Sequence, residues 1–461
     1  MEGTHLRERR QTIKLGLKKV IGDLFPDEKF WTVYSIIDGI YCRLEKSALS
    51  IREVALIEER LKEWVAEKPE IVLLGKSGGF YQYQLGDLVV NTLYKADTDA
   101  SIAEKFRLTP FAEGFISDHS VELNGFGHEL ILPELLSKTY QKNHRWLRKI
   151  GIGKVSDLNT YITDGRQQEL QNVAEALQEK QLADIADTIL GYRRSLRVIL
   201  ISGPSSSGKT TFTQRLSTQL RVNGLKPVPL SIDNYFVNRE FNPLDDKGNY
   251  DFETIRALDL PYFQKQVKRL IKGKRVETPI FDFVTGSRMQ ETIPMQLGSS
   301  EILLIEGIHA LNPELLPNID RSLSYKIYVS ALFGLNVNLF NRTPTTEVRL
   351  LRRMVRDGRD RGVNPEQTLE RWESVRKGET EYVFRHQEEA DVMFNSSLLY
   401  ELNAIRPFAE KHLQQIADDS PYAEAKERLL NLLSFFQPID AKFIPFNSII
   451  REFIGGSVYY H

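Results

Sequence analysis

The chain has 461 residues, 41% of them hydrophobic and 27% charged, which is enough for two or more folded domains and unlike a disordered chain. Lys and Arg number 61 and Asp and Glu 62, and this balance excludes wholesale electrostatic binding to nucleic acid or an anionic membrane. The single cysteine, Cys42, excludes an internal disulfide, and neither a signal peptide nor a run of about 20 apolar residues is visible. We therefore expect a soluble, cytoplasmic, multidomain protein with no membrane partner.

Residues 1–135 are expected to form an α+β domain. Residues 13–25 have the periodicity of an amphipathic helix, and residues 31–44 alternate apolar and polar side chains as a pair of strands does. Ser50 followed by Glu53 has the form of a capping box at the start of a second helix. Residues 70–133 then contain strand-forming residues and Gly-rich turns. Within the strand pair, Cys42 is expected to be a small buried residue.

Residues 136–195 have helical spacing and are predicted to form a connector. Within it, residues 142–149 interleave basic side chains with Trp146, which suits either RNA phosphates or a solvated helix face. Because the net charge gives no support, nucleic acid is not an expected partner. Residues 196–201 form a short β-branched run typical of a buried parallel strand. Strand-like and helix-like segments alternate after it, which predicts an α/β domain with a parallel sheet flanked by helices over residues 196–461.

The strongest motif is GPSSSGKT, Gly203 to Thr210, which fits G-x-x-x-x-G-K-[ST] between a buried strand and a helix. Glycines let successive N–H groups point at phosphate oxygens, and the helix presents its positive dipole end to the same anion. This predicts a site for ATP in which Lys209 contacts the β- and γ-phosphates. The predicted nucleotide-binding residues are Gly203, Ser205, Ser206, Ser207, Gly208, Lys209, Thr210 and Thr211.

Two acidic residues follow predicted strands. Asp233 comes after residues 227–232, and Glu306 ends the apolar run of residues 302–305. Ligands in open parallel sheets bind at the carboxyl ends of strands. Asp233 is therefore placed to accept a proton from an attacking hydroxyl, although a turn Asp after a strand is also common. Thr210 and Glu306 are the predicted ligands of Mg²⁺, Glu306 acting through bound water.

Six segments occur in the order found in uridine kinase-like enzymes of the phosphoribulokinase/uridine kinase group of P-loop kinases. They are GPSSSGKTTF, SIDNYF, NYDFE, PIFDFVTGSR, ILLIEGI and RLLRRMVRDGRDRG, and the resemblance covers roughly residues 196–400. The resemblance implies the P-loop kinase fold, a homo-oligomer and ATP-dependent phosphorylation of a nucleoside 5′-hydroxyl. It makes Asp233 the general base and Asp251 the ligand of the ribose hydroxyls, although Asp251 alone could equally cap a helix.

The remaining segments of the resemblance supply further site residues. Tyr235 and Phe281 lie on the substrate side, and Arg349 matches a residue that contacts the substrate. Arg352 and Arg356, in the same basic run, are the expected neighbours of the transferred phosphoryl group and act with Lys209. The run opens a lid over the phosphates in this group of enzymes, so these arginines are predicted to be catalytic.

Two positions depart from the animal uridine–cytidine kinases. Those enzymes usually have Tyr where Phe281 stands and His where Gly286 stands, and both side chains touch the pyrimidine. Phe281 can stack on a base but cannot form a hydrogen bond with it. Gly286 leaves space for a larger base or for another side chain. The sequence therefore does not identify the base of the nucleoside, and a sugar phosphate or pantothenate is an alternative acceptor.

The N-terminal region, read with the C-terminal ending, resembles a bacterial branch that joins such a kinase to part of threonyl-tRNA synthetase. An editing site of that synthetase needs an H-x-x-x-H pair, which this chain lacks, and His119 and His128 do not form one. We therefore expect no editing activity, and instead a domain used for packing or dimerisation. A nucleotide-gated RNA-binding protein is the alternative from another functional class.

Overall fold

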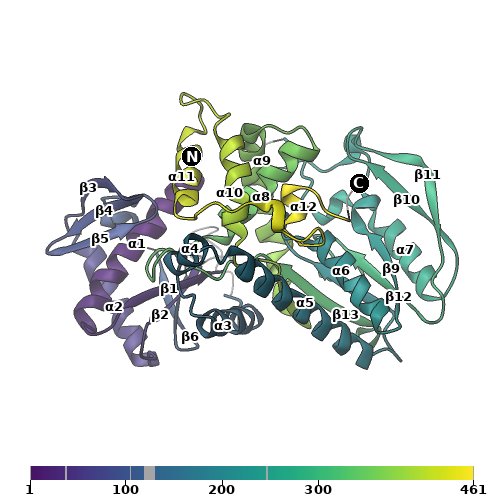
Figure 1. Ribbon diagram of the computed structural model, residues 1–461, viewed down its shortest axis with the longest axis horizontal. Helices are drawn as coiled ribbons and strands as arrows, with labels where there is room; N and C mark the ends of the chain where they lie inside the picture. The colour runs from purple at the N-terminus through teal and green to yellow at the C-terminus, as the bar shows by residue number, and fades with distance from the viewer. Residues whose placement is uncertain (1, 37–38, 104, 119–129, 246–247, 460–461) are drawn as a thin grey trace.

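The computed structural model describes residues 2–36, 39–103, 105–118, 130–245 and 248–459. An N-terminal region with antiparallel sheets lies beside a larger part built on a parallel sheet, and the two form the left and right of Figure 1. No helix in the described ranges is both long and apolar enough to cross a membrane. His119 and His128 lie outside the described residues.

The N-terminal region contains two antiparallel sheets. One has the order β1-β2-β7-β6 and the other β3-β4-β5. Ser50 and Glu53 form the predicted capping box at the start of α2. Cys42 is buried in β2, as expected. The elements are α1 (Glu2–Leu24), β1 (Phe30–Ser35), β2 (Gly39–Leu44), α2 (Ile51–Ala66), β3 (Val72–Ser77), β4 (Phe80–Leu85), β5 (Leu88–Thr92), β6 (Arg107–Phe111) and β7 (Gly114–Asp118).

Three helices follow: α3 (Glu134–Lys149), α4 (Val155–Thr163) and α5 (Gln167–Gly191). Helix α5 packs along α6 (Lys209–Val222), as Figure 1 shows, and its buried Ile185 and Ile189 belong to the same apolar core as Phe212 of α6. On α3, Trp146 packs partly against this core while Arg145 and Lys149 are exposed. Helix α5 thus extends the core of the second part of the chain, while α3 also packs on the N-terminal region, where the ring centres of Tyr140 and Tyr34 are 4.9 Å apart. That residues 136–195 form a connector stays a prediction.

The second part is built on a five-stranded parallel sheet in the order β14-β13-β8-β12-β9. Its central strand β8 is buried at every position, which explains its continuous apolar sequence. The prediction of a parallel sheet flanked by helices is confirmed. The strands are β8 (Val198–Ser202), β9 (Lys226–Ser231), β12 (Glu301–Glu306), β13 (Ser324–Ser330) and β14 (Val392–Asn395), with a separate antiparallel hairpin of β10 (Val276–Asp282) and β11 (Ser287–Met295).

Helices cover this sheet and continue to the C-terminus. They are α6, α7 (Leu260–Ile271), α8 (Thr345–Asp360), α9 (Pro365–Tyr382), α10 (Glu401–Leu413), α11 (Ala423–Ser434) and α12 (Arg451–Ile454). Helix α8 is tied at its start to the N-terminal region. Residues 336–343, just before it, bond to β1, where the Thr32 N–H donates to the Leu339 carbonyl (3.0 Å) and the Thr32 hydroxyl to the Phe340 carbonyl (2.7 Å).

Candidate active site

The loop that joins β8 to α6 curls around its own lysine. Ser206 and Gly208 have φ angles of 57° and 84°, left-handed conformations that turn the backbone sharply. The Lys209 ammonium donates a hydrogen bond to the Gly203 carbonyl at 2.8 Å. The buried hydroxyls of Ser206 and Ser207 have no partner among the described residues. A turned loop, spare hydroxyls and the N-terminus of α6 together suit a phosphate anion.

Two carboxyl groups lie beside Lys209 at the carboxyl ends of neighbouring strands. Asp233 is in a short 3₁₀ turn after β9, and Glu306 is the last residue of β12. Burial raises the pKa of Asp233, while the charges of Lys209 and Arg361 act in the opposite direction. Burial and the charge of Asp233 raise the pKa of Glu306 to about 7. A carboxyl at the end of a strand and beside a lysine has the chemistry of a general base, which accepts a proton from a hydroxyl within hydrogen-bond reach.

Thr210 and Glu306 fit a magnesium ion by their chemistry. Their hydroxyl and carboxylate oxygens are the hard ligands that Mg²⁺ prefers. The described part of the chain has no group of three or more His, Cys, Asp or Glu side chains suited to a metal. Such a group is not needed, because Mg²⁺ keeps several waters and commonly binds through one or two protein oxygens and the substrate phosphates.

Arg349 and Arg352 on α8 lie behind the loop and are almost completely buried. Arg349 forms a two-bond ion pair with Glu379 of α9 (2.5 and 2.7 Å) and donates to the Ser205 carbonyl at 3.0 Å. Arg352 forms a similar pair with Glu401 of α10 and donates to the Ser206 carbonyl at 3.2 Å. Both guanidiniums therefore contact the backbone of the phosphate loop and are already paired with a carboxylate.

Three further arginines of the run gather around Asp357, at the end of α8. Arg353, Arg356 and Arg361 lie 3.3, 2.8 and 3.5 Å from its carboxylate oxygens. Arg353 also donates to the Ser205 hydroxyl at 3.0 Å. Arg361 is close enough to Asp233 to influence its pKa, and the pKa of Arg361 is itself lowered, chiefly by burial. The sequence assigned a role to Arg356 but none to Arg353 or Arg361, because spacing alone does not say which arginines face the loop.

Asp251 lies in a turn that it caps. Its Oδ1 accepts hydrogen bonds from the backbone N–H groups of Glu253 (3.0 Å) and Thr254 (3.2 Å). This is the capping arrangement that the sequence left open, and its Oδ2 has no hydrogen bond recorded within the described residues. Glu253 itself is a site residue that sequence reasoning missed. Burial and the charge of Glu379 raise its pKa to about 7, while Arg353 opposes the rise.

Tyr235 and Phe281, both expected on the substrate side, lie in different environments. Tyr235 is fully buried, its hydroxyl donates to Gln266 at 2.7 Å, and its ring packs edge-on against Phe263. Phe281 is only partly buried and lies at the end of β10, where its N–H donates to the Asn234 side chain at 3.3 Å. The structure thus brings Phe281 next to the segment that carries Asp233 and turns Tyr235 into the core.

The C-terminal segment also reaches the phosphate loop, and the yellow ribbon in Figure 1 runs beside α8. The Glu452 carboxylate accepts hydrogen bonds from the N–H (3.3 Å) and hydroxyl (2.8 Å) of Thr211. The Phe453 ring lies over the Arg352 guanidinium, 4.8 Å from its centre. A Cβ on Gly208 would lie 2.8 Å from the Ile449 side chain, so the loop requires glycine there for space as well as conformation. No local sequence signal indicates this contact.

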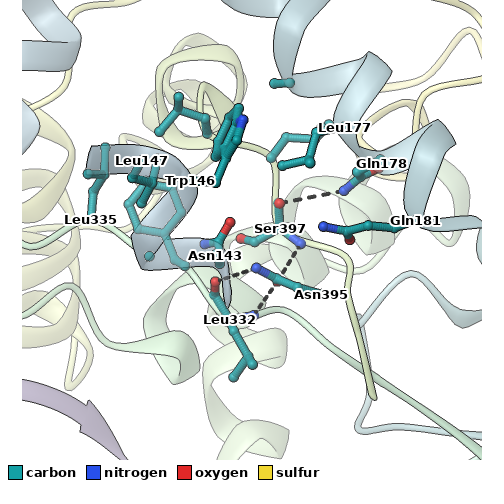
Figure 2. A pocket seen from close by; sticks show the side chains of 15 residues that line it. Asn143, Trp146, Leu147, Leu177, Gln178, Gln181, Leu332, Leu335, Asn395 and Ser397 are labelled. Atoms are coloured by element: carbon teal, nitrogen blue, oxygen red, sulfur yellow. Dashed lines mark hydrogen bonds between the residues drawn. The ribbon is translucent and has the colours of Figure 1, made fainter. Parts of the chain in front are cut away.

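A separate pocket lies between α3, α5 and the loops that follow β13 and β14, and Figure 2 shows its lining. Asn395 bonds to both backbone groups of Leu332, at 2.9 and 3.0 Å, and Gln178 donates to the Ser397 carbonyl at 3.5 Å. None of the residues that line the pocket is charged. It is not part of the phosphate site, because no residue of the loop from Gly203 to Thr210 lines it.

The second part of the chain has relatives of known class. Residues 198–400 match the Phosphoribulokinase / Uridine kinase family model. Similar proteins are the uridine kinases of Bacillus velezensis (26% identity over 178 residues, 39% of this chain and 75% of that protein) and Deinococcus deserti (27% over 197 residues, 42% and 86%). The uridine kinase of Borrelia duttonii is 29% identical over 222 residues, 45% of this chain and 93% of that protein.

A solved structure described as a possible uridine kinase from Bacillus stearothermophilus covers 47% of this chain and 98% of its own, with 22% identity and a TM-score of 0.34. The family model ends near the start of α10 and begins at β8, so it covers the sheet, the loop and the arginines of α8. The resemblance of the N-terminal region to part of threonyl-tRNA synthetase stays a prediction.

Proposed function

We propose that this chain, which carries a phosphoribulokinase/uridine kinase family domain, transfers the γ-phosphoryl group of ATP to the 5′-hydroxyl of a nucleoside. The observation that carries the proposal is the position of Asp233. Its carboxyl lies beside Lys209 and Glu306, where a phosphate-binding loop meets the carboxyl ends of two parallel strands. A hydroxyl held there would face both a base and a bound phosphate.

In the proposed reaction Asp233 accepts the proton of the 5′-hydroxyl as its oxygen bonds to the γ-phosphorus. The bond between that phosphorus and the β–γ bridging oxygen breaks, and ADP leaves. Lys209 exchanges its bond to the Gly203 carbonyl for the phosphate oxygens. Arg353 and Arg361 are the arginines best placed to offset the charge of the transferred group, because Arg353 bonds to the Ser205 hydroxyl and Arg361 acts on Asp233.

Arg349 and Arg352 support the loop in this proposal rather than contacting substrates. Each is paired with a buried carboxylate and each donates to a loop carbonyl. Thr210 and Glu306 hold Mg²⁺, which when bound offsets the negative charge of the phosphates. Oδ2 of Asp251 is proposed to accept from a ribose hydroxyl, since within the described ranges the backbone bonds to this carboxylate reach Oδ1.

The Asp233→Asn variant tests the proposal. ADP release with ATP, Mg²⁺ and a panel of ribo- and deoxyribonucleosides is measured, with ribulose 5-phosphate and pantothenate included. We expect one or more nucleosides to stimulate the unaltered protein, and the variant to lose about 10²-fold or more of kcat while still binding ATP. Asp187→Asn, on the exposed face of α5, is the matched control.

Unchanged kcat in Asp233→Asn would remove Asp233 from the role of base. Stimulation by ribulose 5-phosphate or pantothenate alone would replace the nucleoside by that alcohol. Stimulation by none of these compounds, together with salt-dependent retention of tRNA, would favour the RNA-binding alternative. For the N-terminal region we propose a packing role, supported by the bonds of Thr32 to residues 339 and 340.

A further inference from the structure

Three phenylalanine rings form a wall on the acceptor side of the site. The centres of the Phe236 and Phe281 rings are 5.7 Å apart, those of Phe281 and Phe283 are 5.1 Å apart, and Phe283 is 59% exposed. The wall is joined to the catalytic segment through Asn234, which accepts the N–H of Phe281 and directly follows Asp233. An exposed aromatic surface beside the proposed base is suited to stacking against a flat ring.

Arg239 lies at the edge of this wall, in the space left by Gly286. A Cβ on Gly286 would lie 2.6 Å from Nε and 2.9 Å from Nη2 of Arg239. The backbone N–H of Arg239 donates to the Gly286 carbonyl at 2.8 Å, and Nη2 lies 3.5 Å from the Phe283 carbonyl. Gly286 has a φ of 71°, so a larger residue there would be strained and would also displace the guanidinium. The guanidinium is thus held against the wall by a close-fitting turn.

The guanidinium has spare hydrogen-bonding capacity. No ion pair is recorded between Arg239 and any carboxylate among the described residues. Phe236, Phe281 and Phe283 carry no polar side-chain atoms, and within the described residues the guanidinium donates one long hydrogen bond, from Nη2 to the Phe283 carbonyl at 3.5 Å, which leaves other N–H groups for a ligand. A guanidinium has five N–H donors and no acceptor, and in protein–DNA complexes its commonest specific contact is with O6 and N7 of guanine, one of which is a carbonyl oxygen.

We infer that Arg239 is a specificity-determining residue that binds a carbonyl oxygen of the acceptor's base while the phenylalanine wall stacks on its ring. Resting on the proposed function, this inference narrows the acceptor to nucleosides with a carbonyl oxygen at C4 of a pyrimidine or C6 of a purine, such as uridine and inosine. Cytidine and adenosine carry an amino group in place of that oxygen, and their adjacent ring nitrogen carries no hydrogen. An amino group meeting a guanidinium sets donor against donor, so the hydrogen bond that the carbonyl oxygen accepts is lost.

The test compares kcat/KM for two matched pairs, uridine with cytidine and inosine with adenosine, in the unaltered protein and in Arg239→Ala and Arg239→Gln. We expect the unaltered protein to prefer, in at least one pair, the member with the C4 or C6 carbonyl oxygen, uridine or inosine. Each variant should lose roughly 10- to 100-fold of kcat/KM for that member, the range for a hydrogen bond from a charged donor, and change about threefold or less for its amino counterpart. Arg275→Ala is the matched control, because Arg275 precedes the opposite end of β10 and is exposed.

The preference ratio separates recognition from stability, since a loss of folded protein would lower all four values equally. Equal losses on both members of a pair, or an unchanged ratio in both variants, would overturn the inference while leaving the proposed function standing. Nucleoside-independent ADP release, or turnover of a sugar phosphate alone, would overturn the proposed function and the inference with it. Calorimetric binding of the two members of the preferred pair without ATP gives the same comparison without catalysis, and equal affinities would also count against Arg239.

Discussion

The ion pair between Arg349 and Glu379 decides between two roles for Arg349. The sequence places this residue at the substrate, whereas in the structure the pair is buried, with 1% or less of either side chain exposed. Ser205 joins the pair to the phosphate loop, because its N–H donates to Glu379 at 2.8 Å and its carbonyl accepts from Arg349 at 3.0 Å. We expect Arg349→Met and Glu379→Gln to weaken the fold as well as the loop.

The magnitude follows from what each change leaves behind. Removing one partner leaves the other charge buried and unpaired, which typically costs about 3–5 kcal/mol. Replacing both by apolar residues removes both charges and leaves only the Ser205 N–H and carbonyl without these partners, which costs about 1–3 kcal/mol. The Arg349→Met/Glu379→Met double variant should therefore be more stable than either single charge-removing variant, a coupling that only residues in contact show.

Urea unfolding measures the free energies, and nucleotide and acceptor KM are measured on the same preparations. Arg371→Met, on the exposed face of α9, is the control and should stay within about 0.5 kcal/mol of the unaltered protein. If Arg349→Met keeps the full unfolding free energy and raises only the acceptor KM, the argument from burial is wrong and Arg349 contacts the substrate. If Arg349→Met proves too unstable to purify, the unfolding free energy and acceptor KM of Glu379→Gln are compared with those of the unaltered protein instead. This variant retains an acceptor for the Ser205 N–H.

Three further predictions follow from buried groups. Glu253→Gln should raise the free energy of unfolding by at most about 3 kcal/mol above pH 7 and leave that free energy unchanged near pH 4. Urea unfolding at the two pH values measures this, and equal effects at both would contradict the prediction. The reason is that burial raises the pKa of Glu253 from 4.5 to about 7, so stability is lost as pH rises and the carboxylate forms. Glu452→Ala should cost about 1–3 kcal/mol in the same assay, because the buried Thr211 N–H and hydroxyl lose their acceptor, and an unchanged midpoint would refute it. Tyr235→Phe should cost about 1 kcal/mol through its bond to Gln266 and leave the acceptor KM unchanged, whereas a raised KM would return Tyr235 to the substrate side.

The local features of the site could be predicted from the sequence, because residues close together in the chain determine them. A β-branched run, a Gly-rich loop and a helix in succession produce the turn at Gly208 and the start of α6 directly after it. Acidic residues that end adjacent parallel strands meet at one edge of the sheet, which is why Asp233 and Glu306 lie together beside Lys209. The fold class followed from the same alternation of strand and helix.

Which face of a helix is buried, and which distant residues pair with its side chains, could not be predicted from the sequence in the same way. Helical spacing indicates that Arg349 and Arg352 share a face of α8, but it does not say that Glu379 and Glu401 cover that face and bury both guanidiniums. Position in a motif likewise could not tell that Tyr235 turns into the core, where Gln266 takes its hydroxyl.

The sequence by itself determined that this chain has a P-loop motif between a buried strand and a helix, and acids that follow two other strands of a parallel sheet. Only the tertiary structure decided what surrounds that loop: Glu452, which reaches Thr211 from the far end of the chain, and Arg239, which fills the space at Gly286. The physical reason is that backbone hydrogen bonding and periodicity act over a few residues, whereas the pairing of a buried charge or the filling of a gap depends on which distant segments pack together.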